Sequence, residues 1–328
     1  MKLTASLVLA SLMIVTLGLF IGPVALGVDE VFGALVGAGE PQAIAIVQEV
    51  RAPRVIMAWL VGAALGITGA ALQGLLRNPL ADAGVLGVSG FATLGAVLAF
   101  VTGAAAAWPL APPVGALALA IVAALTVTVL GAAARNAATL ALIGVGLSSF
   151  AGGLIALALN LAPNPAALAD LVNWTLGSVE GRSFADVAIA APFIAAGAAL
   201  MLLAAPGLRA LTLGEEAAGA LGLRLNRTRV LVVLGTAAAA GGATAFVGII
   251  GFVGVAAPHL IRPLVAHDPA RLLLPSAFAG GAMLALADVI VRVLPGDTEL
   301  KLGVAAALIG GPVFALIAAR LASRGGAT

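Results

Sequence analysis

The chain has 328 residues, of which 62% are hydrophobic and 9% charged, with a formal net charge of +2. Soluble domains carry about a quarter charged residues, so this composition excludes an ordinary water-soluble protein. The small net charge argues against nucleic-acid binding. Because the chain has no cysteine, disulfides, thiolate metal sites and cysteine nucleophiles are also excluded.

The first apolar run, residues 3–28, follows Lys2 and fits either a secretory signal peptide or a first membrane helix. The run is longer than the roughly 7–15-residue apolar core of a signal peptide, and further apolar runs follow it. These two features favour an uncleaved membrane helix.

Further apolar runs, each close to the roughly 20 residues that cross a bilayer, continue along the chain. They predict an all-α, polytopic membrane protein with about ten transmembrane helices, at residues 3–24, 54–76, 84–103, 113–134, 139–161, 187–205, 230–249, 251–267, 273–294 and 303–322. Gly248, Gly251 and Gly254 interrupt the run around the eighth helix, so a hairpin or re-entrant turn stays open there. The polar connections are too short for a core of their own, so residues 1–328 are expected to form a single domain.

The distribution of basic residues predicts the orientation. With the N-terminus inside, eleven of the 16 lysines and arginines face the cytoplasm and the remaining five face outside. This satisfies the positive-inside rule, whereas the opposite orientation violates it. We therefore expect both termini to be cytoplasmic.

The polar residues offer no catalytic site. The only lysines, Lys2 and Lys301, lie outside any phosphate-binding G-x-x-x-x-G-K-[ST] motif. Two histidines and no cysteine supply no metal or triad constellation. We expect no enzyme activity and no bound cofactor or metal, so energy must come from another polypeptide.

The cytoplasmic connection 206–229 has short amphipathic turns, in which Leu213 and Leu221 lie near Glu215 and Glu216. Two interpretations remain open from the residues alone. The connection is either a docking surface for a cytoplasmic partner or a solvated, positive loop that fixes topology.

A second segment, residues 72–82, is broken at Pro79, because the residue before a proline is disfavoured in helical geometry. Such a break suits a segment lining a water-filled cavity, so a pore constriction is one interpretation. An ordinary helix end at the interface is the other, and the residues alone favour it.

The remaining charged and ionisable residues suggest one ion pair within the chain and one pair of arginines that is open to two interpretations. Asp288 precedes Arg292 by four positions, so the two can neutralise each other on one helix face. Arg51 and Arg54 flank Pro53 and can either receive a partner's carboxylates or anchor the helix at lipid headgroups. His259, alone at a helix end, is expected to be a structural hydrogen bonder.

Seven motifs, in order along the chain, resemble the permeases that import iron-siderophores, haem and vitamin B12. They are RAPR at 51–54, GAALQGLLRNPLA at 69–81, LGVSG at 86–90, WTLGS at 174–178, LGEEAAGALG at 213–222, FVGVAAPHLIR at 252–262 and LPSAFAG at 274–280. The set covers the chain from about residue 50 onward. Two departures are Asp82-Ala83, where a proline is common at the second position, and Lys301, which replaces a frequent proline.

The resemblance implies the fold and partners of a type II ABC importer permease. Such a protomer has ten helices and pairs into a homodimer around a central path in the bacterial inner membrane. Two cytoplasmic ATPase subunits, which use ATP and magnesium, lie below it, and a periplasmic substrate-binding protein lies above. The permease itself binds lipid but no nucleic acid.

The resemblance also implies three groups of site residues. The coupling helices that seat in the ATPase are expected at Gly214, Glu215, Ala218, Leu221 and Gly222. Docking sites for the acidic lobes of the binding protein are expected at Arg51, Arg54 and Arg292. The cytoplasmic gate is expected at Asn78, Pro79, Leu80, Asn136, Ala137 and Ala138.

For the cargo, the motifs RNPLAD and WTLGS are slightly closer to haem importers, so haem is the first candidate, with ferric siderophore and vitamin B12 as alternatives. Two other classes of function remain to be weighed. An ion-coupled secondary transporter needs ionisable coupling sites within the spans, where Asp288 is the one acid and has an arginine nearby. An intramembrane enzyme needs a nucleophile and a base on facing helices, and the sequence offers no such pair.

Overall fold

A computed structural model describes residues 2–134, 136–162, 165–294 and 299–312, and these ranges contain helices and no strand. Seven helices are long and apolar enough to cross a membrane: Lys2–Phe20, Pro41–Leu76, Ala111–Gly131, Ala137–Asn160, Phe184–Leu203, Leu225–Val247 and Pro269–Val291. Three shorter apolar helices, Val88–Val101, Val253–Val265 and Leu302–Pro312, take the remaining predicted positions. The prediction of an all-α, polytopic membrane protein is confirmed. Residues 313–322 of the last predicted helix lie outside the described residues.

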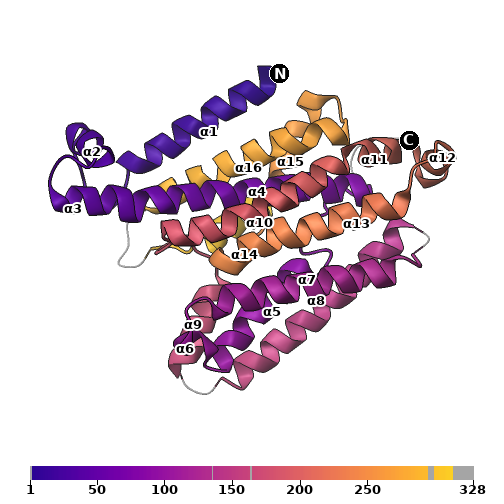
Figure 1. The fold of residues 1–328 in the computed structure, drawn as a ribbon, viewed down its shortest axis with the longest axis horizontal. Helices are drawn as coiled ribbons and strands as arrows, with labels where there is room; N and C mark the ends of the chain where they lie inside the picture. Colours follow the sequence, from indigo (N-terminus) through magenta and orange to yellow (C-terminus); the bar gives the residue numbers. More distant parts are fainter. Residues whose placement is uncertain (1, 135, 163–164, 295–298, 313–328) are drawn as a thin grey trace.

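The elements of Figure 1 follow one another as successive helices. The first half contains α1 (Lys2–Phe20), α2 (Val28–Leu35), α3 (Pro41–Ile44), η1 (Ala45–Arg51), α4 (Ala52–Leu76), α5 (Val88–Val101), α6 (Ala104–Ala107), α7 (Ala111–Gly131) and α8 (Ala137–Asn160). The second half contains α9 (Pro165–Thr175), α10 (Phe184–Leu203), α11 (Ala205–Ala210), η2 (Leu211–Leu213), α12 (Glu215–Ala220), α13 (Leu225–Thr236), η3 (Ala237–Gly241), α14 (Gly242–Val247), α15 (Val253–Ile261), η4 (Arg262–Val265) and α16 (Pro269–Val291).

The connections at residues 25–53 and 162–186, which lie between predicted spans, contain helices that the predicted spans did not include. The first contains α2 and then an unbroken helix that begins at Pro41 and runs to Leu76. Pro41 suits the first helical turn because a backbone N–H at this position has no acceptor within the helix, so the N–H that proline lacks is not missed. Pro53 stays inside the helix because the wider π-helical turn η1 directly precedes it and makes room for its ring. The second connection contains α9.

The long helix α4 lies at the centre of the bundle and packs against α16, α15 and α10. Gly62 of α4 faces Gly280 of α16, and Gly69 of α4 faces Gly254 of α15, so closely that a Cβ on either glycine of α4 would overlap the opposite backbone carbonyl. Small residues at these crossings therefore let the backbones touch, as membrane helices without large interface side chains do.

The break between α14 and α15 lies where glycines interrupt the predicted eighth helix. Gly248 and Phe252 both have positive φ, of 74° and 67°, and the intervening residues are not helical. The eighth predicted helix is therefore short, with α15 and the 3-10 turn η4 spanning only Val253–Val265.

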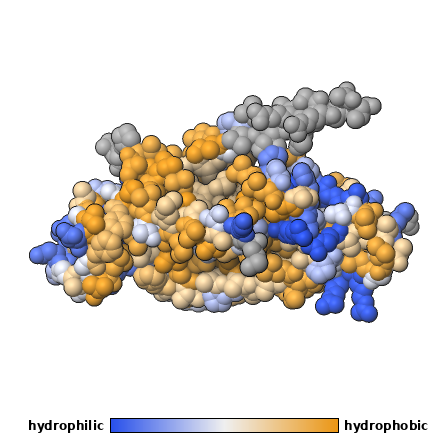
Figure 2. Space-filling view, turned by 90° about the horizontal axis from the view of Figure 1, so that it is seen from above, coloured by the Kyte–Doolittle hydropathy of each residue, from blue (hydrophilic) through white to orange (hydrophobic). Residues whose placement is uncertain are grey.

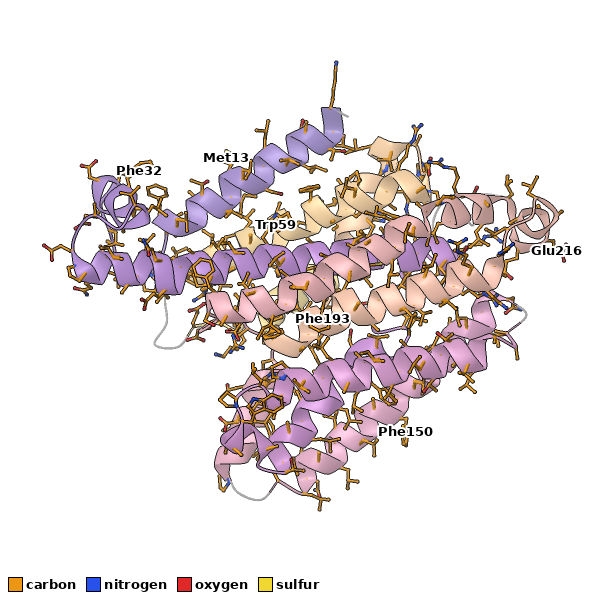
Figure 3. All side chains as sticks on the ribbon, viewed as in Figure 1. Met13, Phe32, Trp59, Phe150, Phe193 and Glu216 are labelled. Atoms are coloured by element: carbon orange, nitrogen blue, oxygen red, sulfur yellow. The ribbon has the colours of Figure 1, made fainter. Side chains whose placement is uncertain are left out.

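Large apolar side chains cover the outside of the bundle. Met13 of α1 is 70% exposed and Phe150 of α8 is 60% exposed, and both point away from the neighbouring helices (Figure 3). Figure 2 shows apolar side chains over much of the flank, with hydrophilic side chains gathered toward the two ends. A surface of this kind suits lipid and not water.

The two ends of the bundle carry different groups of segments (Figure 1). The N-terminus of α1 lies at the same end as α11 and α12, whereas α2, α3 and α9 lie at the other end. The turns after α4 and α7 also lie at the α12 end. The predicted coupling and gate segments thus share one end of the molecule, and the predicted docking residues lie toward the other.

Candidate functional site

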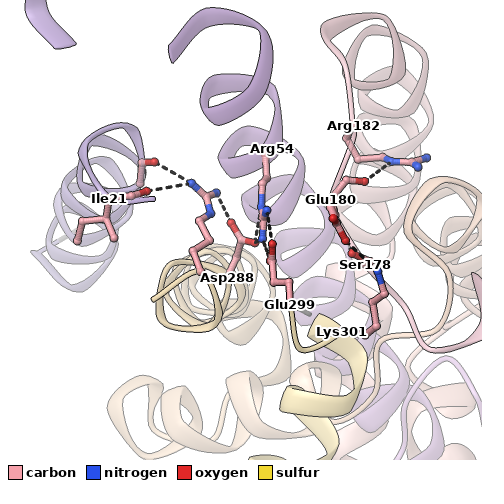
Figure 4. A network of polar contacts seen from close by, with 10 residues as sticks. Ile21, Arg54, Ser178, Glu180, Arg182, Asp288, Glu299 and Lys301 are labelled. Carbon is pink, nitrogen blue, oxygen red and sulfur yellow. Dashed lines mark hydrogen bonds and ion pairs between the residues drawn. The ribbon is translucent and has the colours of Figure 1, made fainter. Parts of the chain in front are cut away.

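Arg54, in the first turn of α4, is the centre of a buried ion network (Figure 4). Its Nε lies 2.9 Å and its Nη2 lies 2.8 Å from Oδ1 of Asp288 on α16, and its Nη1 lies 3.0 Å from Oε2 of Glu299. Asp288 also pairs with Arg292 one helical turn further along α16. The predicted Asp288–Arg292 pair is confirmed, and it belongs to a balanced group of two arginines and two carboxylates.

Arg292 and Arg51 also hold the end of the first helix. Nη1 of Arg292 donates to the carbonyl oxygen of Gly18 at 2.9 Å. Nη1 of Arg51 donates to the carbonyl oxygens of Leu19 and Phe20, both at 2.9 Å. The last carbonyls of a helix have no partner within the helix and carry partial negative charge, so guanidinium groups satisfy them well.

All three predicted docking arginines are therefore placed together, but they are directed into the protein. Arg51, Arg54 and Arg292 are only 3%, 8% and 6% exposed. Within this chain their Nη groups and Nε of Arg54 contact carboxylates or main-chain carbonyls, whereas Nε of Arg292 is buried without a hydrogen-bond partner. A docking protein that uses these arginines would have to share or displace such contacts.

Lys301, the departure from the family pattern, has a defined partner in the structure. Its Nζ lies 2.8 Å from Oε2 of Glu180, and this ion pair joins the connection after α9 to the start of the last helix (Figure 4). The hydrogen bond from Lys301 lowers the pKa of Glu180 below its ordinary value. Both residues line a cavity of about 540 Å³ that also contains Trp174 and Asp170 of α9.

The predicted coupling residues lie on and around the short helix α12. Gly214 and Gly222 flank it with φ of 98° and 86°, which only glycine adopts easily, so they set its two ends. Ala218 is fully buried and faces the bundle, whereas Leu221 is 71% exposed. Leu213, just before the helix, is 62% exposed. Two exposed leucines at a polar end of the molecule are typical of a protein-binding surface.

The predicted gate residues form turns whose polar groups are satisfied locally. Oδ1 of Asn78 accepts from the Leu80 backbone N–H at 3.0 Å, and Pro79 lies within this turn. Oδ1 of Asn136 accepts from the Thr139 N–H at 2.9 Å and so caps α8, and the exposed Ala138 lies in its first turn. The two segments lead into elements that touch, since Oγ of Ser148 on α8 donates to the Gly84 carbonyl at 2.5 Å.

Within the described ranges, no three histidine, aspartate or glutamate side chains are grouped as metal ligands would be. The candidate functional residues therefore lie at two ends of the molecule. One end has the buried ion network around Arg54 and the cavity beside Lys301, and the other has the exposed Leu213 and Leu221 and the two predicted gate turns.

Comparison with known proteins identifies the family. The chain matches the FecCD transport family over residues 8–320. It is 37% identical to the ferric enterobactin transport system permease protein FepD of Escherichia coli, over 98% of this chain and 96% of that protein. It is 36% identical to the hemin transport system permease protein HmuU of Yersinia pestis, over 81% of this chain and 80% of that protein.

A solved structure has the same fold. An inward-facing metal-chelate type ABC transporter superposes with a TM-score of 0.87 at 27% sequence identity, covering 97% of this chain and 99% of that chain. The chain therefore belongs to the FecCD transport family and is a membrane permease subunit of ABC importers, which carry siderophores, haem or vitamin B12, and not an enzyme.

Proposed function

We propose that this permease forms a homodimer in the bacterial inner membrane, with two cytoplasmic ATPases at the α12 end and a periplasmic binding protein at the other. The excess of basic residues at the α12 end supports this orientation, with the N-terminus in the cytoplasm. The proposed cytoplasmic C-terminus lies outside the described residues. Residues 1–328 act as one transmembrane permease domain, with 206–229 as its coupling loop.

The observation that carries the proposal is the exposed pair Leu213 and Leu221 beside α12. We propose that α12 and its flanking residues, Gly214, Glu215, Ala218, Leu221 and Gly222, seat in a groove of the ATPase. Leu221 is the side chain that enters the partner, while Ala218 holds α12 against the bundle. The ATPase supplies ATP and magnesium chemistry, and this chain converts its closure into movement of the helices.

At the other end we propose that Arg51, Arg54 and Arg292 attract acidic residues of the binding protein. Because Asp288 and Glu299 neutralise Arg54 and Arg292 inside the chain, an incoming carboxylate competes with them. Docking would then weaken the ion pair between Arg54 of α4 and Glu299, which lies before the last helix. Loss of this contact would allow the outer end of the bundle to open.

The proposed cytoplasmic gate consists of Asn78, Pro79 and Leu80 from one turn and Asn136, Ala137 and Ala138 from the other. Small and apolar side chains suit this role, because a dry constriction is a barrier to a polar cargo and yet binds it weakly. The ion-coupled transporter is not favoured, since the carboxylate of Asp288 is already paired with Arg54 and Arg292 inside the chain.

Haem is the proposed cargo, supported by the RNPLAD and WTLGS motifs and by Trp174, an aromatic residue that lines the cavity beside Glu180 and Lys301. An uptake experiment distinguishes haem from the two alternative cargoes, ferric siderophore and vitamin B12. The permease, its ATPase and its binding protein are reconstituted in vesicles, and uptake of haem, ferric enterobactin and cobalamin is measured with and without ATP. ATP-dependent haem uptake alone is the expected result. Uptake driven by a proton gradient without the ATPase would overturn the importer assignment.

A further inference from the structure

Arg229, near the start of α13, is a buried cation whose contacts reach two other elements. The residue is 6% exposed. Its Nη1 donates to the carbonyl oxygen of Ala134 at 2.8 Å and contacts that of Gly131 at 3.5 Å. Its Nη2 lies 3.5 Å from Oε2 of Glu215. One guanidinium group therefore joins α12 to the end of α7.

The two partners of Arg229 have different places in the proposed mechanism. Glu215 is the first residue of the coupling helix α12. Gly131 ends α7, and Ala134 lies in the turn that leads to Asn136, the cap of α8 and the first residue of the proposed gate segment 136–138. Two contacts, Glu215 with Arg229 and Arg229 with Ala134, therefore connect α12 to the turn before the gate segment.

We propose that Arg229 is the positioning residue that couples the movement of α12 to gate segment 136–138. This inference rests on the proposed function, because it assigns a path between the proposed ATPase contact and the proposed gate. The charge is what makes the connection firm. A buried guanidinium that loses a partner is left partly unsatisfied, which is costly, so α12, α13 and the end of α7 move together.

Side-chain packing does not replace this connection. A cavity of about 220 Å³ lies between α7 and α13, lined by Val127, Leu140, Val233 and Arg229 among others. Because the apolar contact between the two helices is incomplete there, the polar contacts of Arg229 carry the attachment. An arginine suits the position, since its planar group reaches several acceptors at once, whereas a lysine presents a single point charge.

The beginning of α13 is also fixed to the rest of the coupling loop. Gly207 of α11 lies against Thr228, and a Cβ at this glycine would lie 2.8 Å from the threonine methyl group. Movement of α11 and α12 is therefore passed to the first turn of α13, where Arg229 lies.

The test uses the full complex of permease, ATPase and binding protein in vesicles, and compares wild type with Arg229→Met, Arg229→Lys and Arg271→Met. Arg271 is an exposed arginine in the first turn of α16, outside the coupling loop 206–229, and serves as the matched control. Cargo uptake and ATP hydrolysis are measured together. In Arg229→Met, hydrolysis should stay close to wild type while uptake per ATP falls about tenfold or more, the loss expected from removing hydrogen bonds of a charged group. Arg229→Lys should recover part of the uptake, and Arg271→Met should match wild type.

A distance measurement on the permease alone gives a readout that does not depend on transport. Spin labels are placed on cysteines introduced at the exposed residues Ala133 and Ala217, and the chain has no cysteine of its own to interfere. The label distance should be narrowly distributed in wild type and broad in Arg229→Met. Folding of each variant is checked by its elution as a single species in detergent.

The outcomes separate this inference from the proposed function. Unchanged uptake per ATP in Arg229→Met overturns the positioning role, and so does an equal fall of hydrolysis and uptake, which would mean that Arg229 only maintains the docking surface. A wild-type complex without ATP-driven uptake overturns the proposed function instead. In that case the distance measurement still tests whether Arg229 holds α12 against the end of α7. An unchanged distance distribution in Arg229→Met would show that it does not.

Discussion

Arg54 and Glu299 lie in contact although 245 positions separate them in the chain, with Nη1 of the arginine 3.0 Å from Oε2 of the glutamate. The same guanidinium also binds Asp288, so it connects α4, α16 and the segment before the last helix. With Arg292, two positive and two negative groups balance in a region that is almost closed to solvent. Such a group is stable only while every partner is present.

We expect Arg54→Met to destabilise the protein strongly, because it leaves Asp288 with one cation and Glu299 with none. Removal of one member of a buried ion pair costs about 3–5 kcal/mol. Thermal unfolding in detergent measures the effect, with Arg224→Met, an exposed arginine near the start of α13, as the control. Equal melting temperatures for the two variants would show that the network adds nothing to stability.

The spans were predictable from sequence because each apolar run is a local property of about 20 residues. The pair Asp288 and Arg292 was predictable for the same reason, since four positions along a helix bring two side chains together. The contacts of Arg54 were not. Its partners are 234 and 245 positions away, and no feature of one sequence indicates which distant carboxylates a buried arginine will meet.

The short helices outside the spans were also missed. Residues 25–53 contain no apolar run long enough for a span and so were not assigned a helix, yet α2 forms there and Glu30 accepts a hydrogen bond from the Gly27 N–H at its start. At the coupling loop, the family motif located α12 but not the direction of its side chains. Ala218 faces inward and Leu221 outward because α12 ends at Ala220, so Leu221 no longer follows the helical spacing that would place it on the face of Ala218. No neighbouring residue in the sequence indicated that Arg229 is buried and bound to Ala134, which lies 95 positions away, so the sequence showed it only as one of several cytoplasmic basic residues.

The ion pair of Lys301 with Glu180 should make stability depend on acid pH. The pKa of Glu180 is lowered in the folded state, so the pair contributes fully above the unfolded pKa of about 4.3, and the contribution is lost as pH falls through the lower folded pKa. Wild type should therefore lose more stability than Lys301→Met on going from neutral pH to below about pH 4.

Melting temperatures in detergent across this range provide the measurement. The difference will be small, at most about 1 kcal/mol, because the pair is partly exposed. Lys2→Met is the control, since Lys2 is the only other lysine and is exposed. Parallel pH curves for wild type and Lys301→Met would contradict the assignment of the pair.

Leu221→Asp should abolish stimulation of the partner ATPase and leave membrane insertion intact. A charge at a side chain that enters an apolar groove is desolvated without a partner, whereas in the free permease the same side chain is exposed to water. Leu221→Met keeps the apolar character and should retain stimulation. ATP hydrolysis by the reconstituted complex is measured for both. Normal stimulation in Leu221→Asp would remove α12 from the ATPase contact.

Glu299→Gln should strengthen binding of the periplasmic protein at low ionic strength. If Arg54 attracts carboxylates of the binding protein, Glu299 is an internal competitor, and neutralising it leaves more positive charge for the partner. The gain should shrink with added salt, because charges near the surface are screened. Affinity is measured by surface binding of the empty binding protein to the permease at several salt concentrations. Arg51→Gln, in contrast, should weaken binding, provided that the variant elutes as a single folded species. Unchanged affinity in Glu299→Gln at every salt concentration would mean that Arg54 serves only to hold α4, α16 and the last helix together, and that the binding protein docks through other residues.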